Sequence, residues 1–145
     1  MDKSRWLQIA LGYLALSTAS VGVWAQLAPR SFYDSFPGAG RAWISVDGPY
    51  NEHLIRDVGG LNLALTVLLV AALLTVDWRL IATASVAALA YGVPHLIYHA
   101  ANTEGLATSD VVAILGGLAL FAALPVALLI VGRQVSDSAT APFNA

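Results

Sequence analysis

Two histidines inside an apolar stretch are the side chains of this sequence best suited to chemistry. His95 and His99 stand four positions apart, so a helix places them one turn apart on one face. An ionisable group in an apolar helix costs free energy away from water, so such groups are rare unless something binds them. Two imidazoles at this spacing can also ligate one metal ion from a single helix. The stretch therefore predicts a binding site.

The third histidine, His53, lies ahead of another apolar run and is followed one turn later by Asp57. A short turn at Asp77 to Arg79 separates this run from the one that carries His95 and His99. If the two runs form antiparallel helices in contact, a rise of about 1.5 Å per residue brings Asp57 and His99 to similar height. We therefore expect a metal site formed by His53, Asp57, His95 and His99 at one membrane face, suited to zinc, copper, iron or nickel.

Further polar side chains near these residues are candidate cofactor ligands. Tyr91 and Tyr98 lie on or beside the histidine face, where Tyr98 can fix an imidazole tautomer, and Arg56 can clamp an anion. A quinone site needs aromatic, imidazole and acidic groups, which could come from Tyr91, His95 and Asp57. A haem would need His95 paired with a histidine from a facing helix.

A structural interpretation of the same residues competes with these sites. Histidine and tyrosine are common at membrane interfaces, where their rings bond water or lipid headgroups. His53, Arg56 and Asp57 would then only tie a long loop to the helices. A catalytic nucleophile is not indicated, because Ser85 and Ser109 have no nucleophile motif around them. Catalytic residues therefore remain unassigned.

The composition is that of a membrane protein. The chain has 145 residues, of which 58% are hydrophobic and 11% charged, whereas soluble domains average about 25% charged residues. Absence of cysteine excludes disulfides, thiolate ligands and iron–sulfur clusters. The net charge of −2 without a basic cluster gives no indication of nucleic-acid binding.

Four apolar runs, each near the roughly 20 residues that cross a bilayer, predict an all-α, four-transmembrane-helix bundle. Polar Asn62 and Thr66 inside the second run are expected to face a neighbouring helix. The first run also resembles a signal peptide, but it is long for one, and we expect it to stay uncleaved. We expect a transmembrane domain over 1–134, a flexible cytoplasmic tail over 135–145, and helices at about 6–28, 52–76, 79–101 and 110–132.

The segment Pro29 to Asn51 is an unusually long connection with many aromatic residues, which argues against disorder. We expect it to fold over the outer helix ends as an interfacial anchor or as a lid over a site, with a short helix at Arg30 to Phe36. Basic residues next to the apolar runs orient the chain. They place both termini in the cytoplasm, with Lys3, Arg5, Arg79 and Arg133 on that side.

Two short motifs carry a resemblance: residues 51–60, Asn-Glu-His-Leu-Ile-Arg-Asp-Val-Gly-Gly, and residues 95–99, His-Leu-Ile-Tyr-His. Together they resemble small four-helix membrane proteins of unknown function from actinobacteria, loosely akin to the DoxX-like group. The resemblance covers the second to fourth helices. It implies a four-helix bundle in a bacterial inner membrane, and it implies no reaction.

These observations favour a membrane protein that binds a transition metal or a redox cofactor such as haem at its outer face. A structural or accessory subunit, docked to a larger membrane complex through small-residue helix faces, is the alternative. A membrane enzyme acting on a lipid-soluble substrate is the third hypothesis. The expected partners are the lipid bilayer and other membrane subunits, not nucleic acid.

Overall fold

The computed structural model describes residues 2–140, and side chains through Ser136. This part of the chain is all-helical and contains no strand, which confirms the all-α part of the predicted fold class. Its helices are α1 (Lys3–Leu27), α2 (Pro29–Ser35), α3 (Glu52–Thr75), α4 (Trp78–Ala101) and α5 (Thr108–Thr140). All but α2 are long and apolar enough to cross a membrane. By length and composition, these four candidate spans are those expected of a multi-pass membrane protein.

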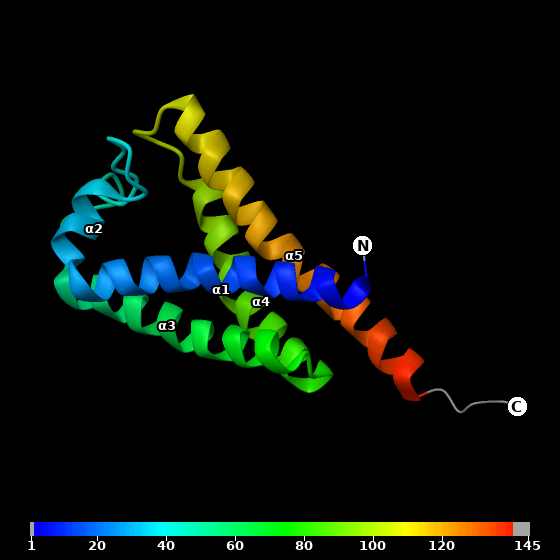
Figure 1. Cartoon of the computed structure of the whole chain (residues 1–145). Helices are drawn as coiled ribbons and strands as arrows, with labels where there is room; N and C mark the ends of the chain where they lie inside the picture. The colour runs from blue at the N-terminus through cyan, green and yellow to red at the C-terminus, as the bar shows by residue number, and fades with distance from the viewer. Residues whose placement is uncertain (1, 141–145) are drawn as a thin grey trace, which may run out of the picture.

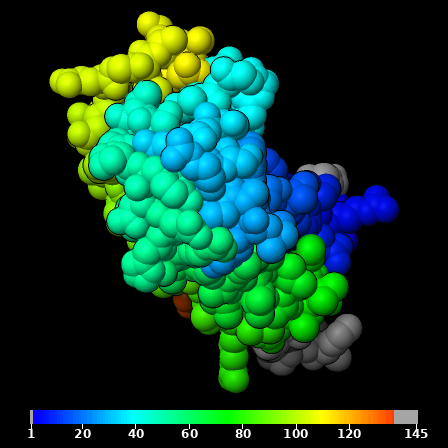
Figure 2. All heavy atoms as spheres, turned by 90° about the vertical axis from the view of Figure 1, so that its left-hand side faces the viewer, coloured from blue at the N-terminus to red at the C-terminus, as the bar shows by residue number. Residues whose placement is uncertain are grey.

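The long helices pack as two pairs that cross each other. α1 packs chiefly against α3, and α4 chiefly against α5, whereas α3 and α4 share a smaller contact (Figure 1). The start of α1 lies beside the end of α5, where the Lys3 ammonium donates to Oε1 of Gln134 at 3.1 Å. From the opposite end of the molecule, α2 and the start of α3 lie together below the α4–α5 link (Figure 2).

The helix boundaries follow from local capping. The Asn51 side chain accepts a hydrogen bond from the Leu54 amide and begins α3 at Glu52, the start predicted for this helix. Val76 takes a left-handed conformation, with φ of 52°, and ends α3. The Asp77 carboxylate then accepts from the amides of Arg79 and Leu80 and begins α4. Two residues therefore separate α3 from α4.

The predicted end of the last helix at 132 is wrong, because α5 continues to Thr140. It therefore includes residues 135–140, which were expected to belong to a flexible tail. No glycine or proline interrupts the stretch from Arg133 to Thr140, so the backbone has no reason to stop at 132. The rest of the predicted tail, 141–145, lies outside the described residues.

The core lies where the two pairs of helices cross. Its buried side chains recur three, four or seven positions apart, so each helix contributes one apolar stripe. The stripes include Leu7, Leu11 and Leu14 of α1, Leu65 and Leu69 of α3, Ile81, Ala84 and Ala88 of α4, and Phe121 and Leu128 of α5. Many large apolar side chains on the other helix faces are exposed, as in helices surrounded by lipid.

Glycines let α1 and α3 approach closely. A Cβ atom on Gly22 would lie 2.9 Å from the Leu63 side chain and 3.1 Å from the Gly59 carbonyl oxygen. Nearby, the hydroxyls of Thr18 and Thr66 share a hydrogen bond of 2.8 Å across the same interface. Small residues and interhelical hydrogen bonds are the features that join helices in lipid. Thr66 therefore faces a neighbouring helix, as predicted.

We predict that Gly22→Ala destabilises the protein by about 1–3 kcal/mol, because the added methyl group overpacks the α1–α3 interface. The matched control is Gly12→Ala on the same helix, where an added Cβ meets no atom within 4 Å. Thermal unfolding in detergent, followed by circular dichroism, measures both variants. Equal melting temperatures for the two would contradict the close approach.

Candidate functional site

A ladder of rings follows one face of α4 toward its C-terminal end. The rings of Tyr91 and His95 stack with centroids 5.3 Å apart and planes 19° apart. The rings of His95 and His99 meet edge to face at 4.7 Å. Tyr98 packs edge-on against His99 at 5.4 Å. The four residues expected to form the α4 part of the site are therefore joined by a continuous series of ring contacts.

One imidazole nitrogen in this ladder has no partner. Nδ1 of His99 is buried and makes no hydrogen bond to any described residue. An unsatisfied buried polar atom of this kind costs about 1–3 kcal/mol. Asp47, in the segment between α2 and α3, is the carboxylate that interacts electrostatically with His95. Asp57 was the acid expected near His95 from the sequence; Asp47 was not predicted, because no helical spacing connects it to His95.

The residues at the start of α3 form a separate, exposed network. Nε2 of His53 lies 3.3 Å from Oδ2 of Asp57, and their side chains are 87% and 56% exposed. Nε of Arg56 donates to Glu52 at 2.9 Å, and Nη1 of Arg56 donates to the Gln26 carbonyl at the end of α1. Arg56 therefore joins α3 to α1, rather than tying the long loop to the helices as the structural interpretation expected.

The expected convergence of three histidines is not seen. Between residues 2 and 140 there is no group of three or more histidine, aspartate or glutamate side chains that could hold a metal ion. The candidates fall into two pairs, His53 with Asp57 and His95 with His99. The reason is that α3 pairs chiefly with α1, so α3 and α4 diverge from their turn instead of running side by side (Figure 1).

The divergence leaves a groove of about 440 Å³ between α3 and α4. Its walls are mostly apolar, with Asn62 on one side and Tyr91 on the other: the lining residues are Leu61, Asn62, Ala64, Leu65, Leu68, Ala87, Ala90 and Tyr91. Asn62 is buried, and its Nδ2 donates to the Val58 carbonyl of its own helix at 2.9 Å. No groove was predicted here from the sequence; polar Asn62 and Tyr91 on neighbouring apolar runs are the features that could have indicated one.

A second hollow, of about 590 Å³, lies between the start of α3 and the segment that precedes it. Leu54 and Ile55 line this hollow, and Leu61 and Asn62 line the groove. Leu54 is seven residues before Leu61, and Ile55 is seven residues before Asn62. Residues seven apart lie on one side of a helix, so the two hollows open on the same face of α3.

Aromatic packing orders the connection between α1 and α3. Phe32 of α2 is buried, and its ring lies 5.8 Å from that of Trp24 and 4.9 Å from that of Phe36. The ring of Trp43 meets that of Phe36 at 6.0 Å. The short helix expected at Arg30 to Phe36 is present as α2.

Asp110 joins this connection to the other pair of helices. Its carboxylate, in the first turn of α5, forms an ion pair with Arg41 and accepts a hydrogen bond of 2.9 Å from Nε1 of Trp43. The segment between α2 and α3 thus contacts α5 as well as α1 and α3. It bridges the two pairs of helices at the end where α3 and α4 diverge.

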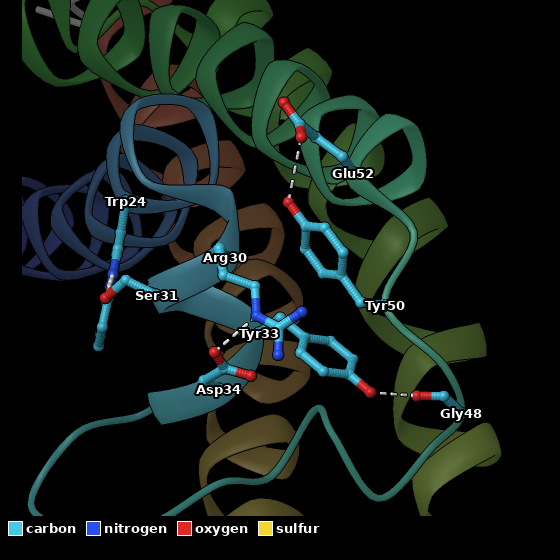
Figure 3. A network of polar contacts seen from close by, with 8 residues as sticks. All are labelled: Trp24, Arg30, Ser31, Tyr33, Asp34, Gly48, Tyr50 and Glu52. Atoms are coloured by element: carbon cyan, nitrogen blue, oxygen red, sulfur yellow. Dashed lines mark hydrogen bonds and ion pairs between the residues drawn. The ribbon is translucent and has the colours of Figure 1, made fainter.

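Arg30 lies against two tyrosines beside the second hollow (Figure 3). Its guanidinium carbon is 5.8 Å from the Tyr33 ring centre and 5.0 Å from that of Tyr50. The hydrogen bond from Arg30 to Asp34 raises the pKa of the guanidinium. Burial, and then the negative charge of Glu52, raise the pKa of the Tyr50 phenol.

Comparison with known proteins gives no match: no family model, curated protein or solved structure is similar to this chain. The resemblance to the DoxX-like group therefore stays a prediction.

We predict that Asp110→Ala loosens the segment 36–51, because Arg41 and Trp43 lose their common partner. Hydrogen bonds to charged groups contribute about 1.5–3 kcal/mol, so amide exchange in this segment should accelerate at least tenfold. Hydrogen–deuterium exchange with mass spectrometry measures the rates, and Glu104→Ala, an exposed acid in the α4–α5 link, is the control. Unchanged exchange in Asp110→Ala would show that this carboxylate does not hold the segment.

Proposed function

We propose that this protein is a multi-pass protein of the bacterial inner membrane that binds a lipid-soluble redox cofactor of the quinone class between α3 and α4. The observation that carries the proposal is that Tyr91 lines the apolar groove and stacks on His95. A quinone ring needs apolar walls along its faces and hydrogen-bond donors at its carbonyl oxygens. The groove supplies the apolar walls, and the ring ladder on α4 supplies the hydrogen-bond donors.

The size and walls of the groove support a ligand that arrives through the bilayer. Its volume of about 440 Å³ falls within the roughly 300–1,000 Å³ of small-molecule sites. Leu61 lines it and is 68% exposed on the outside of α3. A hydrophobic molecule can therefore enter from the lipid side without crossing water.

The polar groups supporting this proposal lie together on α4. The half-buried His95 can donate a ring N–H to a carbonyl oxygen, and the Tyr91 hydroxyl can donate a second hydrogen bond. Asp47 is the acidic group whose charge acts on His95. A metal site formed by His95 and His99 is less well supported than a quinone site, because no third histidine, aspartate or glutamate ligand accompanies these two among the described residues.

An accessory subunit without a ligand of its own is the second candidate. It is favoured by α5, where a Cβ atom on Gly116 or Gly117 would meet no atom within 4 Å. Small residues on an uncovered helix face allow another helix to pack closely in lipid. Such a subunit needs no ligand in the groove, so a binding measurement separates the two candidates.

We predict that the purified protein binds decylubiquinone saturably, as followed by quenching of tryptophan fluorescence. Ala90→Phe fills the groove and should weaken binding at least about tenfold, a change of 1.4 kcal/mol. The control Val93→Phe adds the same ring on the exposed side of α4, outside the groove lining, and should bind as the wild type does. His95→Ala should weaken binding about fivefold through one lost hydrogen bond.

Two results would reject the quinone site. One is the absence of saturable binding to the wild-type protein, which would leave the accessory subunit as the better candidate. The other is equal binding by Ala90→Phe and Val93→Phe, which would place the quinone elsewhere.

We predict that both termini are cytoplasmic, because Arg5, Arg79 and Arg133 adjoin the ends of candidate spans on one side. Single cysteines can be introduced into this cysteine-free chain at Ala39, Thr103 and Ser138. A membrane-impermeant thiol reagent applied to intact cells should label the first two and spare the third. Labelling only at position 138 would reverse the orientation.

A further inference from the structure

The second hollow combines aromatic rings with carboxylates. It is lined by Tyr33 and Tyr50, by the acids Asp47 and Glu52, and by apolar residues that include Ile44 and Leu54. The face of an aromatic ring is electrically negative, so rings and carboxylates attract the same kind of ligand. Its lining contains no lysine, arginine or histidine. The chemistry of these walls therefore favours a cation.

The two tyrosines already bind a cation of the protein itself. The Arg30 guanidinium lies over both rings, yet Arg30 is not among the residues that line the hollow. The ring of Tyr33 meets that of Tyr50 edge-on at 5.3 Å. The Tyr33 hydroxyl donates to the Gly48 carbonyl and the Tyr50 hydroxyl donates to Glu52, so the rings are held in place (Figure 3). Preorganised rings of this kind bind a cation at lower entropic cost.

The charges around the hollow leave one carboxylate unpaired. Arg30 is paired with Asp34 at 2.7 Å, and Arg56 with Glu52 at 2.8 Å. Asp47 lines the hollow and forms no ion pair with any residue of the described chain. Its exposed carboxylate thus supplies a net negative charge beside the two rings.

We propose that this hollow binds an organic ammonium group, held between the rings of Tyr33 and Tyr50 and the carboxylate of Asp47. Aromatic faces favour weakly hydrated organic cations, quaternary ammonium groups above all, and Asp47 adds charge attraction. The ammonium group can belong to a phospholipid headgroup or to a free amine. The site is distinct from the groove and does not depend on quinone binding.

The test uses the whole chain reconstituted in nanodiscs of phosphatidylglycerol, which carries no ammonium group. Choline chloride is the probe, and titration calorimetry measures its binding, with sodium chloride as the control for ionic strength. We expect saturable choline binding. A second set of nanodiscs containing phosphatidylethanolamine separates the two sources. Competition with choline identifies a lipid headgroup as the ligand, and undiminished binding identifies a free amine; both results support an ammonium site.

Substitutions at Tyr50 and Asp47, with a control at Tyr13, locate the site. Tyr50→Leu should weaken choline binding about three- to thirtyfold, whereas Tyr50→Phe keeps the ring and should stay within about twofold of the wild type. Tyr13→Leu removes an exposed tyrosine of α1 as a matched control. Asp47→Asn removes only the charge of a side chain without hydrogen bonds to other residues, so it decides the question if Tyr50→Leu does not fold. No saturable binding, or wild-type affinity in Asp47→Asn, would overturn the proposal.

Discussion

The close approach of α1 and α3 determines the rest of the structure. Gly22 and Gly59 remove the side chains that would keep the two helices apart, and Thr18 bonds Thr66 across the interface. α1 takes this face of α3, and the two helices joined by the tight turn at Val76 and Asp77 diverge and share a smaller contact. α4 instead packs on α5, and the space between α3 and α4 becomes the groove.

The connection between α1 and α3 compensates for this divergence. It fills its own small core around Phe32 and reaches α5 through Asp110. It also places Asp47, whose charge acts on His95, in the lining of the second hollow. A single segment thus joins the two pairs of helices and contributes an acidic group to the second hollow.

The sequence predicts those features that depend on local spacing. The apolar runs predicted the four long helices, including the start of α3 at residue 52, and the four-residue spacing placed His95 and His99 on one helix face, where their rings are in contact. Helix pairing depends on which distant faces fit together, and no spacing within one helix encodes it. The prediction that His53 and His99 meet assumed that two helices consecutive in the sequence pack against each other along their whole length. The interface containing Gly22 and Gly59 shows why that assumption failed.

Hydrogen bonding separates the structural polar groups of the long helices from the functional ones. Thr18 and Thr66 satisfy each other, and Asn62 bonds a carbonyl of its own helix. The buried hydroxyl of Ser85 has no partner in the described chain, but a serine can rotate to a carbonyl one turn earlier. The His99 ring is flanked by His95 and Tyr98, and its buried Nδ1 has no hydrogen-bond partner among the described residues. That unmet requirement is the physical reason to look for a ligand, or a bound water, beside α4 rather than beside the exposed His53.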